Sequence, residues 1–188
     1  MEINKLHKHL IDCKYLVSTD TRKIIPKSIF FALKGENFDG NDYAIEAIKK
    51  GASYAVVDID LQNDSFKNQI IKVDNVLQTL QNLGKFNRKK SSAKVIALTG
   101  SNGKTSTKEL IKSVLEIRFE TICTDGNLNN HIGVPLSLLK IRPETEIAII
   151  EMGANNFGEI DFLTNLIIPD IGYITCLLYT SDAADEVD

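Results

Sequence analysis

The residues that decide the fold run from Val95 to Thr105 and read VIALTGSNGKT. The first four form a continuous apolar run with the length and composition of a strand buried on both faces. Apolar side chains then recur at helical spacing, and we expect them to face inward: Leu110, Ile111, Val114, Leu115 and Ile117. We expect the charged side chains between them to face water: Lys108, Glu109, Lys112 and Glu116. A strand, a glycine turn and a helix in this order predict a phosphate-binding loop.

The turn contains the residue types that phosphate binding requires. Glycines let the backbone approach an anion, and the N–H groups at the start of a helix face it. Lys104 adds a movable charge, and the Thr105 hydroxyl can reach a Mg²⁺ ion between the β- and γ-phosphates. The candidate nucleotide-binding residues are Thr99, Gly100, Ser101, Asn102, Gly103, Lys104, Thr105 and Ser106. Because Leu98 replaces the first glycine of the general P-loop pattern, a glycine turn with an incidental lysine is the alternative interpretation.

Length and composition narrow the class of protein. A chain of 188 residues, 43% of them hydrophobic, can bury a core and hold one or two domains. The net charge of -3, with both signs mixed, does not favour a nucleic-acid-binding face. The first twenty residues do not resemble a signal peptide, and no apolar run approaches the ~18 residues that span a bilayer. Three widely spaced cysteines without metal-ligand spacing favour reduced thiols, so we expect a cytoplasmic protein. Separately, we expect a monomer.

Strands and helices alternate along the whole chain, which predicts an α/β layer structure with a mostly parallel sheet. We expect strands at 15–17, 28–33, 53–57, 69–73, 95–98, 121–124, 147–150 and 171–175. Besides the helix after the glycine turn, we expect helices at 3–11, 43–51, 75–88, 135–141 and 158–168. Residues 89–93 read as a linker. We therefore expect a small first domain at 1–90 and a second domain that the phosphate loop opens, at 91–175.

Glu151 follows a second fully apolar strand directly. In open parallel sheets, ligands gather at the carboxyl ends of the strands, and the phosphate loop leaves another such end. A carboxylate there is well placed to hold Mg²⁺ directly or through water. The alternative is a strand-end residue in solvent or in a salt bridge.

Five stretches, in order, resemble one known family. They are STDTR at 18–22, ALKGENFDG at 32–40, TGSNGKTSTK at 99–108, GNLNNHIGVP at 126–135 and EMGANNFGEI at 151–160. These stretches resemble the Mur ligases, the ATP-dependent amide-forming enzymes of bacterial peptidoglycan synthesis. The last stretch most resembles the MurF type, which adds D-alanyl-D-alanine to a UDP-N-acetylmuramoyl tripeptide. The resemblance covers roughly residues 14 to 175.

The resemblance implies a mechanism, a set of ligands and a role for each site residue. ATP and Mg²⁺ would be the cofactors, and ATP would phosphorylate the terminal carboxylate of the tripeptide before the amine of D-alanyl-D-alanine attacks. Lys104, Glu151 and Asn130 would be catalytic, and Thr105 and Glu151 would hold Mg²⁺. The substrate-binding residues would be Thr21, Arg22, Lys34, Gly35 and Asn37 at the UDP end, and Asn127 and Asn129 near the acceptor. Whether the third residue of the tripeptide is lysine or diaminopimelate stays open.

The sequence departs from the family after residue 175. The family continues with an Asn, a His, a lysine that becomes carbamylated and a third domain, whereas Cys176 to Asp188 here form an acidic tail without basic residues. We interpret this tail as non-native, from a frameshift or a library end, and the alternative is an acidic disordered tail. We therefore expect the chain to be inactive alone. The rival functions are a sister ligase that adds the third amino acid, a folate or cyanophycin ligase, and a non-catalytic UDP-sugar-binding module.

Overall fold

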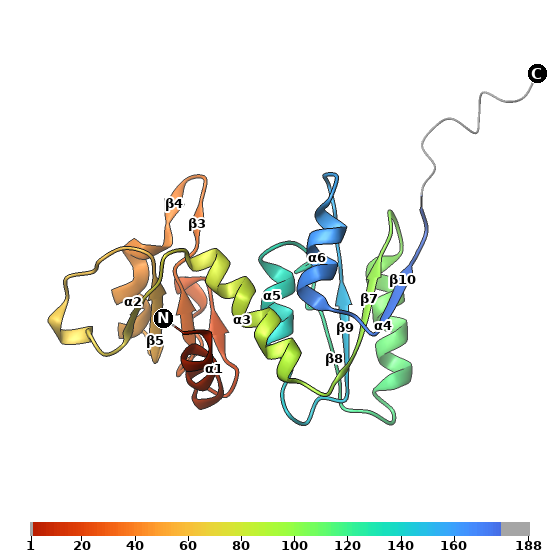
Figure 1. Cartoon of the computed structure of the whole chain (residues 1–188), viewed down its shortest axis with the longest axis horizontal. Coiled ribbons are helices and arrows are strands. Elements are labelled where there is room, and N and C mark those ends of the chain that lie inside the picture. Colours follow the sequence, from red (N-terminus) through yellow and green to blue (C-terminus); the bar gives the residue numbers. More distant parts are fainter. Residues whose placement is uncertain (1, 178–188) are drawn as a thin grey trace, which may run out of the picture. The chain divides into compact units, whose positions relative to one another are not determined.

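The computed structural model describes residues 2–177, and the chain divides into two compact units (Figure 1). The first unit consists of Met1–Ser91 and Pro135–Arg142, and the second of Ser92–Val134 and the chain from Pro143 onward. The chain thus passes from one unit to the other at 91–92, 134–135 and 142–143. Most of the predicted acidic tail lies outside the described residues. The predicted domain bounds of 1–90 and 91–175 stay predictions.

The first unit is built on a parallel four-stranded sheet of order β1-β2-β5-β6. Its strands are β1 (Val17–Ser18), β2 (Ile29–Phe31), β5 (Tyr54–Val57) and β6 (Ile70–Lys72), with an antiparallel hairpin of β3 (Lys34–Gly35) and β4 (Phe38–Asp39). Its helices are α1 (Ile3–Asp12), α2 (Ala44–Lys49) and α3 (Val76–Lys90), with short 3-10 turns η1 (Thr21–Lys23), η2 (Gly40–Tyr43) and η3 (Asp64–Phe66). Strand β1 begins two residues later than predicted, because Lys14 and Tyr15 turn the chain with positive φ angles of 53° and 62°.

Helix α3 organises the packing of the first unit. It follows Asn75, whose side chain accepts a hydrogen bond from the Gln78 backbone N–H at 2.7 Å and so caps the helix. Its last turn includes two lysines assigned above to the linker, a position in which cations complement the helix dipole. The buried Asn87 amide donates to the carbonyl oxygens of Leu138 and Ile141, both at 2.9 Å. These two bonds explain why residues 135–142 belong to the first unit.

The second unit is a parallel four-stranded sheet of order β10-β7-β9-β8. Its elements are β7 (Lys94–Thr99), α4 (Lys104–Leu115), β8 (Thr121–Cys123), β9 (Ile147–Glu151), α6 (Glu159–Ile167) and β10 (Ile171–Ile174). Helix α5 (Gly133–Leu139) begins in this unit, and its residues from Pro135 onward belong to the first unit. The connection from β7 through α4 to β8 and the connection from β9 through α6 to β10 run across the sheet in opposite directions. Right-handed crossovers therefore place these helices on opposite faces (Figure 1). The order of connection reverses between β7 and β9, which is where ligands bind in such sheets.

Helix α4 corrects one prediction. Lys108, which we expected to face water, is fully buried, whereas Leu110 and Val114, expected inside, are each 67% exposed. Ile111 and Leu115 are half-buried. The helix is thus rotated from the predicted orientation, so that Lys104 and Lys108 lie one turn apart on the face that meets the sheet.

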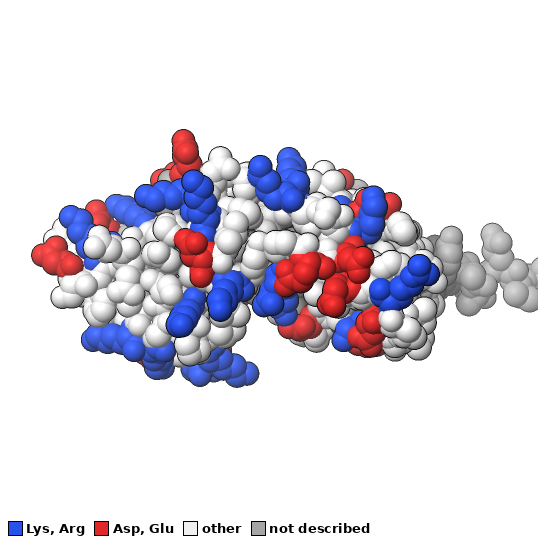
Figure 2. Space-filling view, turned by 90° about the horizontal axis from the view of Figure 1, so that it is seen from below, with Lys and Arg blue, Asp and Glu red and all other residues white. Residues whose placement is uncertain are grey.

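Two surface properties complete the description. No helix within residues 2–177 is both long and apolar enough to cross a membrane. Positive and negative side chains are interspersed over the face that Figure 2 shows.

Candidate functional site

The predicted phosphate loop joins the end of β7 to the start of α4. Gly100 and Gly103 have φ angles of 148° and 81°, a region that L side chains rarely adopt, so both turns depend on glycine. Gly103 precedes α4 directly, and no side chain caps the first turn of this helix. The first N–H groups of the helix therefore remain oriented toward the loop, as an anion site requires.

Lys104 folds back over this loop. Its Nζ donates a hydrogen bond to the Gly100 carbonyl oxygen at 2.7 Å. It also donates to the Ser101 carbonyl oxygen at 3.5 Å. The Thr175 hydroxyl supports the loop from β10, because it donates to the carbonyl oxygens of Thr99 and Asn102 at 3.1 and 2.7 Å. A lysine held over a glycine loop by backbone carbonyl oxygens alone can move to a phosphate without rearrangement of the loop.

Glu151, at the end of β9, lies beside the start of α4. Leu98 and Glu151 are register partners in adjacent parallel strands, so this carboxylate lies level with the end of β7. Glu151 is 2% exposed, and its Oε2 accepts a hydrogen bond from the Thr105 hydroxyl at 3.1 Å. Its Oε1 accepts one from the Asn129 side-chain amide at 2.9 Å. The structure thus brings together three of the predicted site residues from separate segments of the chain.

The oxygens of Thr105 and Glu151 fit a hard cation. A hydroxyl and a carboxylate oxygen at this separation are ligands of the kind that Mg²⁺ prefers. Within residues 2–177, no group of three or more His, Cys, Asp or Glu side chains forms a metal cluster. A Mg²⁺ ion bound here would therefore take its other ligands from phosphate oxygens and water, as it does in nucleotide sites.

Sequence reasoning missed the buried polar residues behind Glu151. Thr124 is buried, and its Oγ1 accepts a hydrogen bond from the Glu151 backbone N–H at 3.0 Å. The Lys108 Nζ lies 3.9 Å from Glu151 Oε2. The available signal for Lys108 was its position four residues after Lys104, which places both lysines on one helical face.

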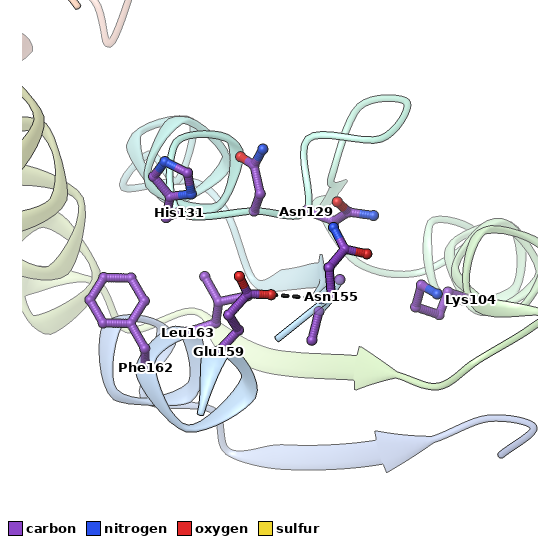
Figure 3. A pocket seen from close by; sticks show the side chains of 10 residues that line it. Lys104, Asn129, His131, Asn155, Glu159, Phe162 and Leu163 are labelled. Atoms are coloured by element: carbon purple, nitrogen blue, oxygen red, sulfur yellow. Dashed lines mark hydrogen bonds between the residues drawn. The ribbon is translucent and has the colours of Figure 1, made fainter. Parts of the chain in front are cut away.

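A pocket of about 320 Å³ adjoins the phosphate loop (Figure 3). It is lined by Lys104, Asn129, Asn130, His131, Gly153, Ala154, Asn155, Glu159, Phe162 and Leu163. Asn127, predicted to bind substrate, is not among the lining residues. The Asn130 side-chain oxygen accepts hydrogen bonds from the N–H groups of Ile132 and Gly133 at 3.1 and 2.9 Å, so this oxygen orders the turn before α5.

Glu159 organises the loop at 153–158 that borders this pocket. Its Oε2 accepts hydrogen bonds from the backbone N–H groups of Asn155 and Asn156 at 2.7 and 3.1 Å. The side-chain bond from Asn156 and these two backbone bonds lower the pKa of Glu159. A negative charge at the start of α6 also complements the helix dipole. These interactions fix the chain that follows Gly153.

The first unit has its own pocket, of about 420 Å³, at the predicted UDP end. It is lined by Thr19, Asp20, Thr21, Arg22, Phe30, Phe38, Gly40 and Tyr43. Of the five residues predicted to bind UDP, Thr21 and Arg22 line this pocket, whereas Lys34, Gly35 and Asn37 do not. The hydrogen bonds from Arg22 lower the pKa of Asp20 to about 2. Sequence reasoning missed the exposed rings of Phe38 and Tyr43, although aromatic residues beside a polar turn are a usable signal.

Each unit contains a region that matches a model of a known protein family. Residues 15–88 match the Mur ligase family catalytic domain, and residues 98–179 match the Mur ligase middle domain. The chain belongs to the Mur ligase family. This membership confirms the predicted resemblance and the α/β fold class.

Individual relatives of this Mur ligase chain have one function in common. UDP-N-acetylmuramoyl-tripeptide–D-alanyl-D-alanine ligases from Bacillus subtilis and Escherichia coli are 43% and 44% identical over 159 and 165 residues. These matches cover 85% and 86% of this chain, and the chain spans about 35% of the length of either relative.

Solved structures show the same relationship. A crystal structure of MurF from Acinetobacter baumannii superposes with a TM-score of 0.76 at 38% identity, over 84% of this chain and 34% of that one. The MurF ligase from Thermotoga maritima in complex with ADP gives 0.73 at 30% identity, over 86% of this chain and 37% of that one.

Proposed function

We propose that this chain carries the UDP-binding and ATP-phosphate-binding parts of a ligase that adds D-alanyl-D-alanine to a UDP-N-acetylmuramoyl tripeptide. The observation that carries the proposal is the hydrogen bond between Thr105, which follows the lysine of the phosphate loop, and Glu151 at the end of β9. The names of the relatives support the substrates, and the Thermotoga maritima complex with ADP supports the nucleotide. ATP, Mg²⁺ and a cytoplasmic location belong to the same proposal.

The proposed chemistry assigns a task to each residue of the second unit. Transfer of the γ-phosphoryl group of ATP to the tripeptide carboxylate gives an acyl phosphate and ADP. The amine of the dipeptide then attacks the acyl carbon, and the amide forms as inorganic phosphate leaves and the amine loses a proton. Phosphoryl transfer depends chiefly on positioning and charge neutralisation. Lys104 moves from the Gly100 carbonyl oxygen to the phosphates. Thr105 and Glu151 would hold Mg²⁺, which would supply charge neutralisation for the phosphate oxygens. Asn129 fixes the Glu151 carboxylate from the side that faces the pocket.

The pocket beside Lys104 is the proposed place of the acceptor carboxylate. It continues from the phosphate loop past Asn129 and Asn130, and its polar lining suits a charged peptide terminus. The Asn130 oxygen is engaged in ordering its own turn, so the group that Asn130 offers to substrate is its side-chain N–H. Asn127 does not line this pocket, and its role in substrate binding stays a prediction.

In the first unit, the proposal places the UDP end in the pocket beside η1. Arg22 supplies a charge for the diphosphate, and its guanidinium is 85% exposed. Lys34 binds Asp58 at 2.9 Å and does not line this pocket, so we propose that it supports the hairpin and not the ligand.

Titration of the chain with ADP and Mg²⁺ in a calorimeter tests the nucleotide site. Lys104→Ala lowers the affinity about 100-fold or more, because a charge aimed at the phosphates is lost. Lys112→Ala, two turns further along α4 and paired with Glu116 on the surface, is the matched control and leaves binding unchanged. Equal binding by both variants would contradict the assignment of the loop. In a complete ligase with this sequence, Lys104→Ala lowers turnover by the same order.

Titration with UDP tests the first unit separately. Arg22→Ala weakens UDP binding about 10-fold, because a charge-assisted contact to phosphate is lost. The neighbouring Lys23→Ala, whose side chain is not part of the pocket, does not. In a complete ligase with this sequence, ADP release from ATP and D-alanyl-D-alanine in the presence of the tripeptide then separates a ligase from a UDP-sugar-binding module, which releases none.

A further inference from the structure

Lys108 lies in the second turn of α4 and is fully buried, with 0% of its side chain exposed. A lysine is almost never buried to this degree unless its ammonium group is paired. Neither the predicted phosphate contact nor the proposed metal contact uses this residue. Its burial therefore requires an explanation of its own.

The contacts of the Lys108 ammonium reach two other segments. Its Nζ donates hydrogen bonds to the carbonyl oxygens of Thr124 and Gly126 at 2.7 and 3.4 Å. It lies 3.9 Å from Glu151 Oε2, and this carboxylate is as enclosed as the lysine. The Glu109 carboxylate also approaches, at 3.2 Å, but it is 56% exposed and screened by water.

The partners of Lys108 are connected to Glu151 by further hydrogen bonds. The Thr124 hydroxyl oxygen accepts a hydrogen bond from the Glu151 backbone N–H. The Thr124 carbonyl oxygen accepts one from the Lys108 ammonium. The turn through Gly126 continues to Asn129, whose amide holds the other oxygen of Glu151. One ammonium group thus touches both the carboxylate and the start of the loop that orients this carboxylate.

We propose that Lys108 is a positioning residue for the phosphoryl-transfer site. Its ammonium is the buried counter-charge of Glu151 and the anchor of the turn through Thr124 and Gly126. Without this charge, Glu151 would lie in a closed site with neutral partners only, Thr105 and Asn129, which is costly for a carboxylate. The proposal rests on the proposed function in one respect: the reaction at this site is the one described above.

The competing explanation is that Lys108 only fills space between α4 and the sheet. Methionine has nearly the same length and lacks the charge, so Lys108→Met preserves packing and removes the interaction. A packing role predicts that the effects of Lys108→Met and Glu151→Gln add. A role through Glu151 predicts that they do not, because the variant that lacks both charges leaves neither one buried and unpaired.

The experiment compares the parent chain, both single variants and the double variant. Hydrogen exchange of peptides from β9 reports the stability of the second unit, and ADP titration with Mg²⁺ reports the site. We expect Lys108→Met to accelerate exchange about 100-fold or more, since it breaks a buried pair, and to weaken ADP binding at least ~10-fold. In the Glu151→Gln background, the same substitution accelerates exchange less than ~10-fold and changes ADP binding less than ~3-fold.

Lys112→Met, one turn further along α4, is the control and stays within about twofold of the parent chain in both measurements. Additive effects of the two substitutions overturn the proposal. If Lys108→Met does not fold, folding of the double variant supports the proposal, and failure of the double variant while Glu151→Gln folds overturns it. If the parent chain does not bind ADP, the nucleotide assignment fails, and the exchange data alone decide whether Lys108 and Glu151 are coupled.

Discussion

Gly153 protects the hydrogen bond between Asn129 and Glu151, and Gly153→Ala tests this role. The backbone of Gly153 is not in the positive-φ region, so alanine is allowed there. A Cβ atom at this position would lie 2.8 Å from both Cγ and Oδ1 of Asn129. The Asn129 amide must then move, and its 2.9 Å bond to the Glu151 carboxylate is lost.

The expected magnitude follows from two opposing effects. A hydrogen bond to a charged group contributes about 1.5–3 kcal/mol to stability. Replacing glycine by alanine at a compatible position returns about 0.4–1 kcal/mol by restricting the unfolded chain. The net destabilisation is about 1–2 kcal/mol, which corresponds to roughly 5- to 30-fold faster hydrogen exchange in β9.

The assay is hydrogen exchange of β9 peptides, because the chain has two units and its global unfolding need not be two-state. Asn129→Ala provides the control background, since it removes the side chain with which the new methyl group collides. In that background Gly153→Ala becomes neutral or stabilises the unit slightly. The same destabilisation in both backgrounds would refute the reasoning, because the clash would then not involve Asn129.

Two further predictions concern the first unit. Asn75→Ala removes the cap of α3 and lowers the free energy of unfolding by about 1 kcal/mol, measured by urea unfolding followed by circular dichroism. Asn63→Ala is the control, because Asn63 precedes η3 without a side-chain cap bond. For the second, burial raises the pKa of Asp58, but hydrogen bonds from Lys34 and Asn41 outweigh it and hold this pKa below its usual value of 3.8. The ionised carboxylate therefore stabilises the fold above pH 3.8, and this contribution is lost as the pH falls through the lowered pKa. Lys34→Met reduces stability only slightly at pH 7, because the pair is partly exposed. The unfolding curves of the two chains converge at low pH, and a pH-independent difference would contradict this origin.

Local sequence patterns predicted much of the fold because they act over short distances. The apolar run of β7, the Asn75 cap and the alternation of strands and helices each depend on a few neighbouring residues. The rotation of α4 could not be predicted in this way, since both of its sides carry apolar residues and Leu110 and Val114 are exposed. Which side faces the sheet depends on partners of Lys108 that lie 16 to 43 residues away.

The candidate site shows the same division between local and distant causes. Lys104 and Thr105 could be predicted from one continuous motif, and Glu151 from its position at the end of an apolar strand. That these residues meet depends on the parallel register of β7 and β9, which pairs Leu98 with Glu151. A shift of one residue in that register would turn the Glu151 side chain to the other face of the sheet, away from Thr105. The buried charge of Lys108 on the α4 side favours the observed register, because Glu151 there lies 3.9 Å from the Lys108 ammonium. Residues that read as surface charges in the sequence can thus select the strand pairing on which the site depends.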